Sequence, residues 1–445
     1  MSKKWQAHTM IRTGLWFPIF LMSLLFTACV NEDIEKWPEK GDFYDSSKPI
    51  SFDAMTPDWG RINDSFVITG NFPSDTSKIR IFFGDKRAVV ISSDGHQAYG
   101  LVPKQSPGYN KITLVVDGRP YEGKDVKFKY YQTQSVKTVL GKFGERNFKP
   151  GILGEARLEY CSVLVTVKGK KTDNLIFMGS GWNDKTYFVS LEDNLMTQLI
   201  NIGYLGGVAV DNSREKVTIM PRNDGAVYTA TRQDGWTLNS LGLNVPFQGD
   251  CQGSLAYGDD DNLVYAMSGD GLYEINLGDK AYNKVLDINS FPQVYNGINT
   301  GQWFHYLVYS KYDKCFYASY CDQNGIVKMW KDSDGVWQAE RFAGFRSGAT
   351  AMGDRLNDAV LRNPRGMAVN SQGELYVCCH DGHCIVKIKG RLVSLVAGHP
   401  DHSGQVNGYP TDAYFDGPWS IATDSEDNFY IGEDNTGVIR KMTIE

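Results

Sequence analysis

Two copies of one pattern decide the fold: NDAVLRNPRGMAV at residues 357–369 reappears as TDAYFDGPWSIAT at residues 411–423. Each copy is followed by two further β runs: GELYV (373–377) and IVKI (385–388) after the first, NFYIG (428–432) and VIRKM (438–442) after the second. Short strands that recur at a fixed period with turns between them are typical of a β-propeller, in which each repeat forms one blade.

More degenerate copies extend the repeat toward the N-terminus. Inner strands are readable at 207–211 and 254–257, and second strands at 263–266 and 315–318. The units resemble the NHL repeat, which implies four-stranded blades. About 310 residues at about 50 per unit then predict a six-bladed β-propeller over residues 135–445.

The two ends of the repeat region predict how the ring closes. The fifth unit finishes with the run LVSLVAG at 392–398, whereas the sixth reaches residue 445 without an equivalent run. VKTVLG at 136–141 has the required character and lies at the start of the region. We therefore expect this segment to be the outer strand of the last blade, which leaves no exposed sheet edge there.

A different pattern occupies residues 49–131. Short alternating runs such as FVI (66–68), IRIF (79–82) and ITLVV (112–116) are separated by Gly, Pro, Asp and Asn, which predicts a β-sandwich. The segments PDWG (57–60) and VITGNF (67–72) resemble the IPT/TIG family of immunoglobulin-like domains. The resemblance implies a spacer or docking module without catalytic residues, in which Gly70 and Gly84 need the absence of a Cβ. The fold class is therefore all-β.

The N-terminus has the features of a signal peptide over residues 1–28. Three basic residues precede an apolar run at 15–26, which is shorter than the roughly 20 residues of a membrane-spanning helix. FTAC at 26–29 resembles the lipobox of bacterial lipoproteins, although Phe26 replaces the usual leucine. The resemblance implies that Cys29 is lipidated. The alternative is ordinary secretion, with Cys29 an incidental thiol.

A polar segment, residues 29–48, follows the predicted cleavage site. Its acidic start, VNEDIE at 30–35, resembles the signal that exports some Gram-negative lipoproteins to the cell surface. We therefore expect an outer-membrane, lipid-anchored location at the cell surface. A flexible, solvated tether is the other interpretation of the same residues, and both can hold together. Membrane contact is expected through the lipid anchor only.

Composition narrows the classes of partner. The 445 residues carry a net charge of −6, and loss of the leader removes three basic and no acidic residues. Nucleic acid is therefore not expected as a partner. The seven cysteines besides Cys29 have no regular spacing and are expected to be mostly buried thiols. One bridge among Cys378, Cys379 and Cys384 is the alternative.

Candidate ligand contacts come from the loops on one face of the ring, those between second and third strands and those leading into inner strands. Aromatic rings beside amides and carboxylates suit sugars, which offer an apolar C–H face and many hydroxyls. The same residue types also form ordinary turns. We place Trp182 first because it lies in a polar turn. The full set is Trp182, Asn183, Asp184, Arg222, Asn223, Trp303, His305, Tyr320, Asp322, Asn324, His380, Asp381, Glu433 and Asn435, with Trp419 and His383 nearby.

Catalysis is the competing interpretation, because His380, His383, His399 and His402 lie close together in the sequence. Three imidazoles around an open position are the ligand set of a catalytic zinc. Some NHL propellers are zinc-dependent lyases that take ligands from different blades, whereas these four come mainly from one blade. The resemblance therefore does not carry ligands over. We expect no metal or cofactor.

These inferences converge on a binding protein. Lipoproteins with this domain arrangement resemble accessories of polysaccharide uptake in Gram-negative bacteria, so the expected ligand is a polysaccharide or oligosaccharide. Uptake proteins of the outer membrane are the implied protein partners. Two alternatives stay open, namely a protein-interaction scaffold at the cell surface and a propeller lyase or hydrolase.

Overall fold

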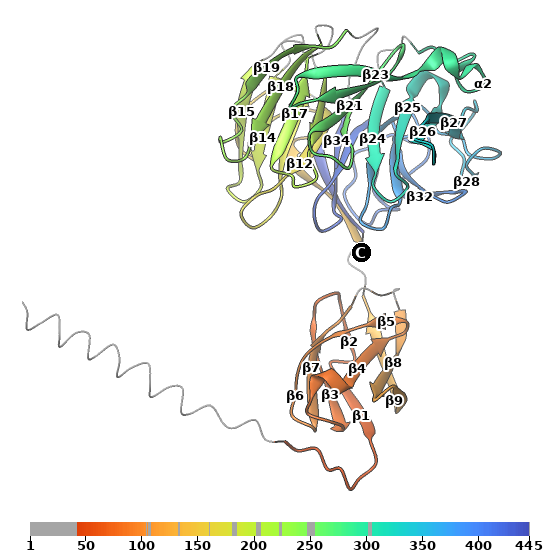
Figure 1. Ribbon diagram of the computed structural model, residues 1–445. Coiled ribbons are helices and arrows are strands. Elements are labelled where there is room, and N and C mark those ends of the chain that lie inside the picture. The colour runs from red at the N-terminus through yellow and green to blue at the C-terminus, as the bar shows by residue number, and fades with distance from the viewer. Residues whose placement is uncertain are drawn as a thin grey trace, which may run out of the picture. The chain divides into compact units, whose positions relative to one another are not determined.

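The computed structural model describes residues 42–444 except 104, 106–107, 132–133, 160, 180–184, 202–205, 222–224, 247–253 and 301–304. The chain divides into two compact units on either side of the bond between Gln132 and Thr133. Both units consist mainly of strands (Figure 1). The predicted leader and Cys29 lie outside the described residues. Within the described part, no helix has the length and hydropathy of a membrane span.

The first unit is a sandwich of two sheets. Its elements are β1 (Ser51–Thr56), β2 (Trp59–Gly60), β3 (Ser65–Asn71), η1 (Thr76–Lys78), β4 (Ile79–Phe83), β5 (Lys86–Arg87), β6 (Val89–Ser93), β7 (Gln97–Leu101), β8 (Gly108–Val116) and β9 (Arg119–Tyr130). One sheet has the order β1-β3-β7-β6 and the other β2-β9-β8-β4-β5. All neighbours are antiparallel except β2 and β9, which are parallel.

Alternation along the strands builds the core of the sandwich, as in β3, where Phe66 and Ile68 are buried. Phe83 joins the two sheets, since its ring lies 5.1 Å from the rings of both Phe66 and Phe128. A Cβ at Gly70 would lie 2.2 Å from the Ser51 carbonyl oxygen, and Gly84 has a φ of +57°. Both predicted glycine positions are therefore confirmed, one by close approach of two strands and the other by a left-handed turn.

The second unit contains six sheets within its described residues. From inner to outer strand, the first three blades are β12 (Cys161–Val167), β13 (Asn174–Gly179), β14 (Lys185–Ser190), β15 (Leu195–Asn201); β16 (Gly207–Val210), β17 (Lys216–Met220), β18 (Ala226–Thr231), β19 (Asn239–Asn244); and β20 (Leu255–Tyr257), β21 (Leu263–Ser268), β22 (Gly271–Asn276), β23 (Ala281–Asp287). The short β11 (Gly151–Ile152) pairs with β15.

The other three blades are β24 (His305–Ser310), β25 (Cys315–Tyr320), β26 (Gly325–Lys331), β27 (Trp337–Gly344); β29 (Pro364–Val369), β30 (Leu375–Cys379), β31 (Cys384–Lys389), β32 (Leu392–Gly398); and β33 (Pro418–Thr423), β34 (Phe429–Glu433), β35 (Val438–Ile444), β10 (Gln134–Gly141). The short β28 (Gly353–Asp354) pairs with β32. Three short helical turns, η2 (Ile288–Ser290), α2 (Pro292–Tyr295) and η3 (Cys321–Gln323), connect strands.

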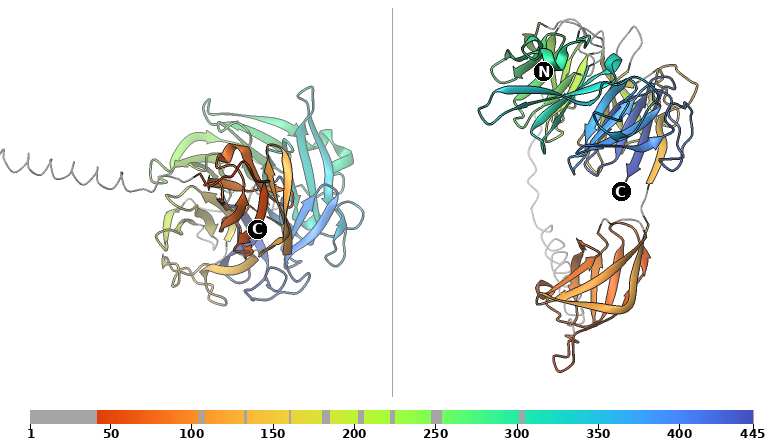
Figure 2. Two further views of the ribbon diagram at one scale, coloured as in Figure 1. Left: turned by 90° about the horizontal axis from the view of Figure 1, so that it is seen from below. Right: turned by 90° about the vertical axis from the view of Figure 1, so that its right-hand side faces the viewer.

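The inner strands form a closed ring. β12, β16, β20, β24, β29 and β33 contact one another in this order, and β33 contacts β12. In the view from below in Figure 2, the chain colours accordingly follow one another around the ring. The fold is therefore an immunoglobulin-like sandwich followed by a six-bladed β-propeller, as predicted.

The N-terminal strand of the propeller closes its last blade. β10 pairs antiparallel with β35 from Gln134 opposite Ile444 to Gly141 opposite Val438. It also contributes to the core, because Val136 and Leu140 are each only 1% exposed. The prediction that residues 136–141 supply the missing outer strand is confirmed.

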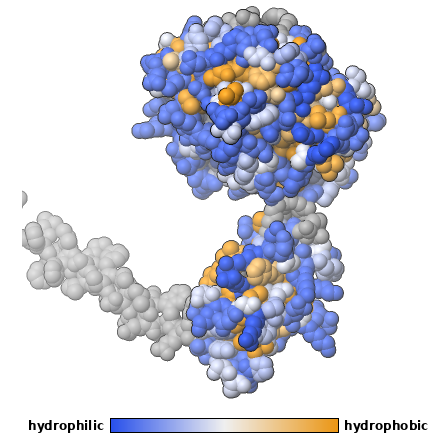
Figure 3. Space-filling view, turned by 45° about the vertical axis from the view of Figure 1, so that its right-hand side comes forward, coloured by the Kyte–Doolittle hydropathy of each residue, from blue (hydrophilic) through white to orange (hydrophobic). Residues whose placement is uncertain are grey.

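Apolar side chains fill the spaces between blades. One cluster contains Cys379, Cys384 and Trp419, and Trp330 packs against it. All six described cysteines outside the leader are buried and free, namely Cys161, Cys315, Cys321, Cys378, Cys379 and Cys384. The expectation of buried thiols is confirmed for them. Most of the surface seen in Figure 3 is hydrophilic, with smaller hydrophobic patches on both units.

Candidate functional site

The loop face of the propeller carries the turns between second and third strands and the loops that enter inner strands. Its described residues belong mainly to the last three blades. Several predicted contacts lie outside the described residues: Trp182, Asn183, Asp184, Arg222, Asn223 and Trp303. His305 begins β24, but its side chain is also outside the description.

Four residues from four inner strands meet across the ring near the loop face, and we call them the floor. Ser162, Tyr306, Arg365 and Trp419 are each the second residue of an inner strand, and each is at most 8% exposed. The indole N–H of Trp419 donates to the Tyr306 hydroxyl, which donates to the Ser162 carbonyl oxygen at 3.1 Å. These bonds join three blades across the channel.

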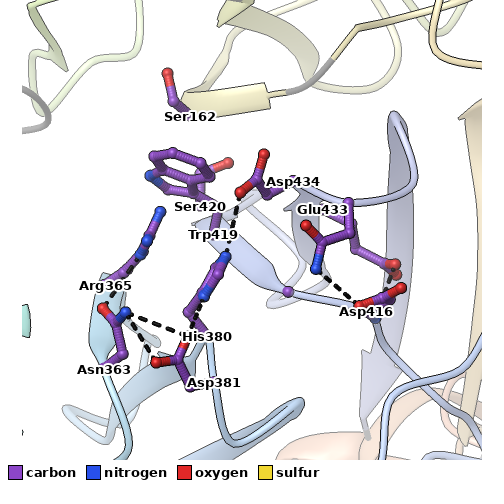
Figure 4. Close-up of polar contacts among 12 residues, drawn as sticks. Ser162, Asn363, Arg365, His380, Asp381, Asp416, Trp419, Ser420, Glu433 and Asp434 are labelled. Atoms are coloured by element: carbon purple, nitrogen blue, oxygen red, sulfur yellow. Dashed lines mark hydrogen bonds and ion pairs between the residues drawn. The ribbon is translucent and has the colours of Figure 1, made fainter.

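His380 lies against the floor, between two carboxylates (Figure 4). Its Nδ1 is 2.6 Å from Asp381 Oδ1, and its Nε2 is 3.3 Å from Asp434 Oδ2. The ring also meets the edge of Trp419, with 5.7 Å between centroids. Hydrogen bonding from His380 lowers the pKa of Asp381 to about 2. Both carboxylates remain accessible, since the side chains of Asp381 and Asp434 are 46% and 19% exposed.

Asn363 ties this group to the floor and to the neighbouring blade. Its side-chain amide donates to both carboxylate oxygens of Asp381 at 3.2 Å and accepts from Arg365 Nε at 3.3 Å. Its backbone N–H donates to Asn324 Oδ1 at 2.9 Å. Asn324 is left-handed, with a φ of +53°, and ends the η3 turn. The predicted residues Asn324, His380 and Asp381 therefore belong to one hydrogen-bonded network.

A second network adjoins the first on the sixth blade. The exposed Asn435 donates to Asp416 Oδ1 at 2.8 Å. His383 Nδ1 accepts the Gly417 N–H at 3.2 Å, and burial lowers the pKa of His383. The Cβ that an L-residue would add at Gly417 would come within 3.0 Å of His380 Nε2, so the loop packs closely against the imidazole.

Glu433 supports this second network from the interior. Its prediction as a ligand contact is wrong, because its side chain is buried. Its side chain is 0% exposed and forms an ion pair with the equally buried Arg440 at 2.8 Å. Its other oxygen accepts from the Asp416 N–H at 3.1 Å and from Thr436 Oγ1 at 2.9 Å. Burial raises the pKa of Glu433 to about 7. The residue stabilises the loop instead of facing solvent.

The prediction of Tyr320 as a ligand contact is also wrong. It ends β25 with a fully buried side chain whose ring lies 6.0 Å from Tyr295, so it belongs to the core between blades. Asp322, two residues later, is exposed on the η3 turn. The last residue of a second strand points inward here, whereas the turn residues that follow it reach the surface.

Three members of the networks were missed in the sequence: Asn363, Arg365 and Asp416. A fourth is Arg146, whose Nη2 lies 3.8 Å from Asp434 Oδ1. The repeat itself holds the signal for Arg365, because NPRG at 363–366 aligns with GPWS at 417–420. Trp419 was predicted, and Arg365 is its equivalent in the preceding blade.

The chemistry of these groups favours hydrogen bonding. Within the described residues, no set of three or more His, Cys, Asp or Glu side chains is arranged to hold a metal ion. Ser420 Oγ donates to the Cys161 carbonyl oxygen at 2.9 Å and is buried. Burial raises the pKa of the Cys161 thiol to about 12, so this thiol is a poor nucleophile. The accessible carboxylates, amides and Arg146 remain as ligand-binding groups.

A cavity of about 430 Å³ occupies the channel on the other side of the floor. All six inner strands line it, and its rim comes from turns between first and second strands. Rim residues include Asn212, Arg214, Lys311, Tyr312, Ser371 and Asp427. None of these rim residues was predicted, because the sequence pattern pointed to the loops of the opposite face.

Comparisons with known proteins agree with this architecture. A model of the IPT/TIG domain matches residues 50–130, and a model of the NHL repeat matches residues 361–388. A search of curated proteins found no match. The first unit therefore matches the IPT/TIG domain, and the matched NHL repeat lies in the fifth blade of the propeller.

Solved structures match along nearly the whole chain. A protein of unknown function from Bacteroides thetaiotaomicron has 25% identity and a TM-score of 0.74, covering 90% of this chain and 100% of that one. Auxiliary nutrient binding proteins from Bacteroides thetaiotaomicron and Bacteroides ovatus each have 19% identity. Their TM-scores are 0.58 and 0.59, covering 92% and 90% of this chain and 100% and 99% of theirs. At this identity the latter two establish a shared fold.

Proposed function

We propose that this protein is a lipid-anchored protein of the outer membrane surface that binds a polysaccharide or oligosaccharide on the loop face of its propeller. In this role it is an accessory of nutrient uptake. The observation that carries the proposal is the network around His380, in which accessible carboxylates are held in place beside a buried indole and guanidinium.

Sugar recognition explains why these groups are fixed. A hydroxyl both donates and accepts, so neighbouring hydroxyls pair well with carboxylate and amide groups. The network holds Asp381 through His380 and Asn363, and it holds Asp434 through His380. Because these side chains are already ordered, binding loses less conformational entropy. Trp182, Arg222 and Trp303 remain proposed contacts from the neighbouring blades.

The solved relatives support a binding role. The two proteins described as auxiliary nutrient binding proteins match over both units of this chain, the sandwich as well as the propeller. The signal-like residues 1–28, Cys29 and the acidic residues 30–35 support export and lipid anchoring.

Binding is tested with soluble protein from Val30 onward and a panel of polysaccharides, using affinity gels and calorimetry. We expect Asp381→Asn and Asp434→Asn to weaken binding at least tenfold, with Asp334→Asn as a control on the exposed β26–β27 hairpin. Trp182→Ala is expected to cost about 1–3 kcal/mol of affinity, as for a lost aromatic anchor.

Metal content and turnover decide between binding and catalysis. We expect binding to persist in chelator and the oligosaccharide to be recovered unchanged. Stoichiometric zinc that is lost in a His380→Ala, His383→Ala double variant, or cleavage of a panel member, would make an enzyme the leading assignment. If the protein instead binds an outer-membrane protein and none of the glycans, a protein-interaction scaffold becomes the leading assignment.

A further inference from the structure

The outer face of the sandwich sheet β2-β9-β8-β4-β5 carries a row of exposed aromatic residues, which we call the aromatic row. Trp59 on β2 and Tyr109 on β8 both lie directly opposite Lys129 of β9. Trp59 is 56% exposed and Tyr109 is 72% exposed. Tyr131, just after β9, lies on the same side and is 42% exposed.

Lys129 lies between the rings of this row. Its Nζ is 5.0 Å from the ring centre of Tyr131 and 5.8 Å from that of Tyr109. The rings of Trp59 and Tyr131 are 5.9 Å apart at an interplanar angle of 85°. Three large rings thus present their surfaces to solvent around one cation. Such exposure of adjacent apolar surface commonly marks a binding site.

Cationic side chains continue along the same sheet face. Lys127 lies opposite Lys111 across β9 and β8, and Arg80 and Arg87 lie opposite the outward-facing Val115 and Phe82. Lys111 forms an ion pair with Glu122 at 2.5 Å.

The other cations of this face are not neutralised in the same way. No ion pair with an acidic side chain is found among the described residues for Lys127, Lys129, Arg80 or Arg87. This face is therefore positive although the whole chain carries a net charge of −6.

We propose that this sheet face is a second binding surface, which takes an anionic polysaccharide carrying carboxylate or sulfate groups. The C–H faces of sugar rings stack on Trp59 and Tyr109, and the acidic groups pair with Lys129 and Lys127. Five strands about 4.8 Å apart span about 19 Å, which accommodates several sugar rings. Charge complementarity selects an acidic chain over a neutral one.

The surface is independent of the propeller site, because none of its residues belongs to that unit. A failure of one proposal is therefore separable from a failure of the other. Asp434→Asn, which is expected to weaken binding at the propeller, is expected to leave the charge-dependent binding at the sandwich unchanged.

The test uses the soluble chain from Val30 with polygalacturonate and chondroitin sulfate as acidic probes and dextran as a neutral probe. We expect binding of an acidic probe that weakens with added salt. A Trp59→Ala, Tyr109→Ala double variant and Lys127→Glu are each expected to lower this affinity at least tenfold. Matched controls are Tyr99→Ala on the opposite sheet, where Tyr99 is 38% exposed, and Lys78→Glu on η1.

Three outcomes would overturn the proposal. The first is a wild-type chain that retains neither acidic probe, or retains dextran equally well. The second is unchanged affinity in both test variants, with folding verified by melting curves. The third is a pair of test variants that no longer bind vesicles containing phosphatidylserine but keep their affinity for the acidic polysaccharides. That result would assign the face to a membrane surface.

Discussion

Arg365 and Trp419 occupy the same position in consecutive repeats, and the guanidinium carbon of Arg365 lies 3.8 Å from the ring centre of Trp419. Each residue follows a proline at the start of an inner strand, and these two strands, β29 and β33, are neighbours in the ring. Because equivalent positions of adjacent blades are brought side by side, the repeat stacks a cation on an aromatic ring. This stack is part of the floor against which His380 packs.

The floor is expected to contribute to the stability of the ring. Trp419→Phe and Tyr306→Phe each remove one partner of the hydrogen bond that joins the fourth and sixth blades. A double-mutant cycle on urea-unfolding free energies is expected to give a coupling of about 1 kcal/mol. Additive single effects would show that this bond contributes nothing.

Ring closure by β10 predicts a position-dependent loss of stability. Leu140 is 1% exposed, so Leu140→Ala is expected to lower the unfolding free energy by about 2–5 kcal/mol. The exposed Lys137 on the same strand is the control, and Lys137→Ala is expected to change it by less than about 0.5 kcal/mol. A chain beginning at Gln134 should melt as a propeller, whereas one beginning at Lys142 should melt at a lower temperature. Equal melting temperatures would contradict the closure.

Glu433 predicts a pH dependence of stability. Burial raises its pKa from the ordinary 4.5 to about 7, so the folded state holds a proton that the unfolded state releases between these values. The unfolding free energy should therefore fall as pH rises from about 4.5 to 7, by at most about 3 kcal/mol from this group. Glu433→Gln should flatten that part of the profile. A variant profile parallel to that of the wild type would show that Glu433 does not titrate there.

The lipid anchor predicts where the protein is found. Labelled palmitate should enter the wild-type protein, and protease added to intact cells should degrade it. Cys29→Ala should release the protein from the membrane fraction, because the proposed attachment depends on the acyl chains of that residue. A membrane-bound Cys29→Ala variant would refute the anchor. Resistance to protease until the cells are lysed would place the protein in the periplasm.

Much of the fold was predictable from local pattern. The aligned copies at 357–369 and 411–423 specify a blade, and chain length then sets the number of blades. The missing last strand was predictable because a four-stranded repeat that lacks one strand at one end must find it at the other. Gly70 and Gly84 were predictable because a glycine beside a β run usually marks a turn or a close approach that a Cβ would block.

The candidate site was predictable only in part, and Glu433 and Asn435 show why. Both were candidates in the sequence, yet Glu433 is buried against Arg440 and Asn435 is exposed. The difference depends on which residue is the last of β34, since that side chain points into the space between blades. No local pattern indicates that the buried Arg440 of β35 lies in that space and pairs with Glu433.

The sequence by itself determined the repeat, the closure of the ring and the sandwich, because strand periodicity and turn chemistry are local properties of the chain. Only the tertiary structure decided that Asn363, Arg365, His380, Trp419 and Asp434 meet at one point, and that Trp59 and Tyr109 flank Lys129. These meetings depend on strand register and on the packing of blades. Both are set by contacts between segments far apart in the chain.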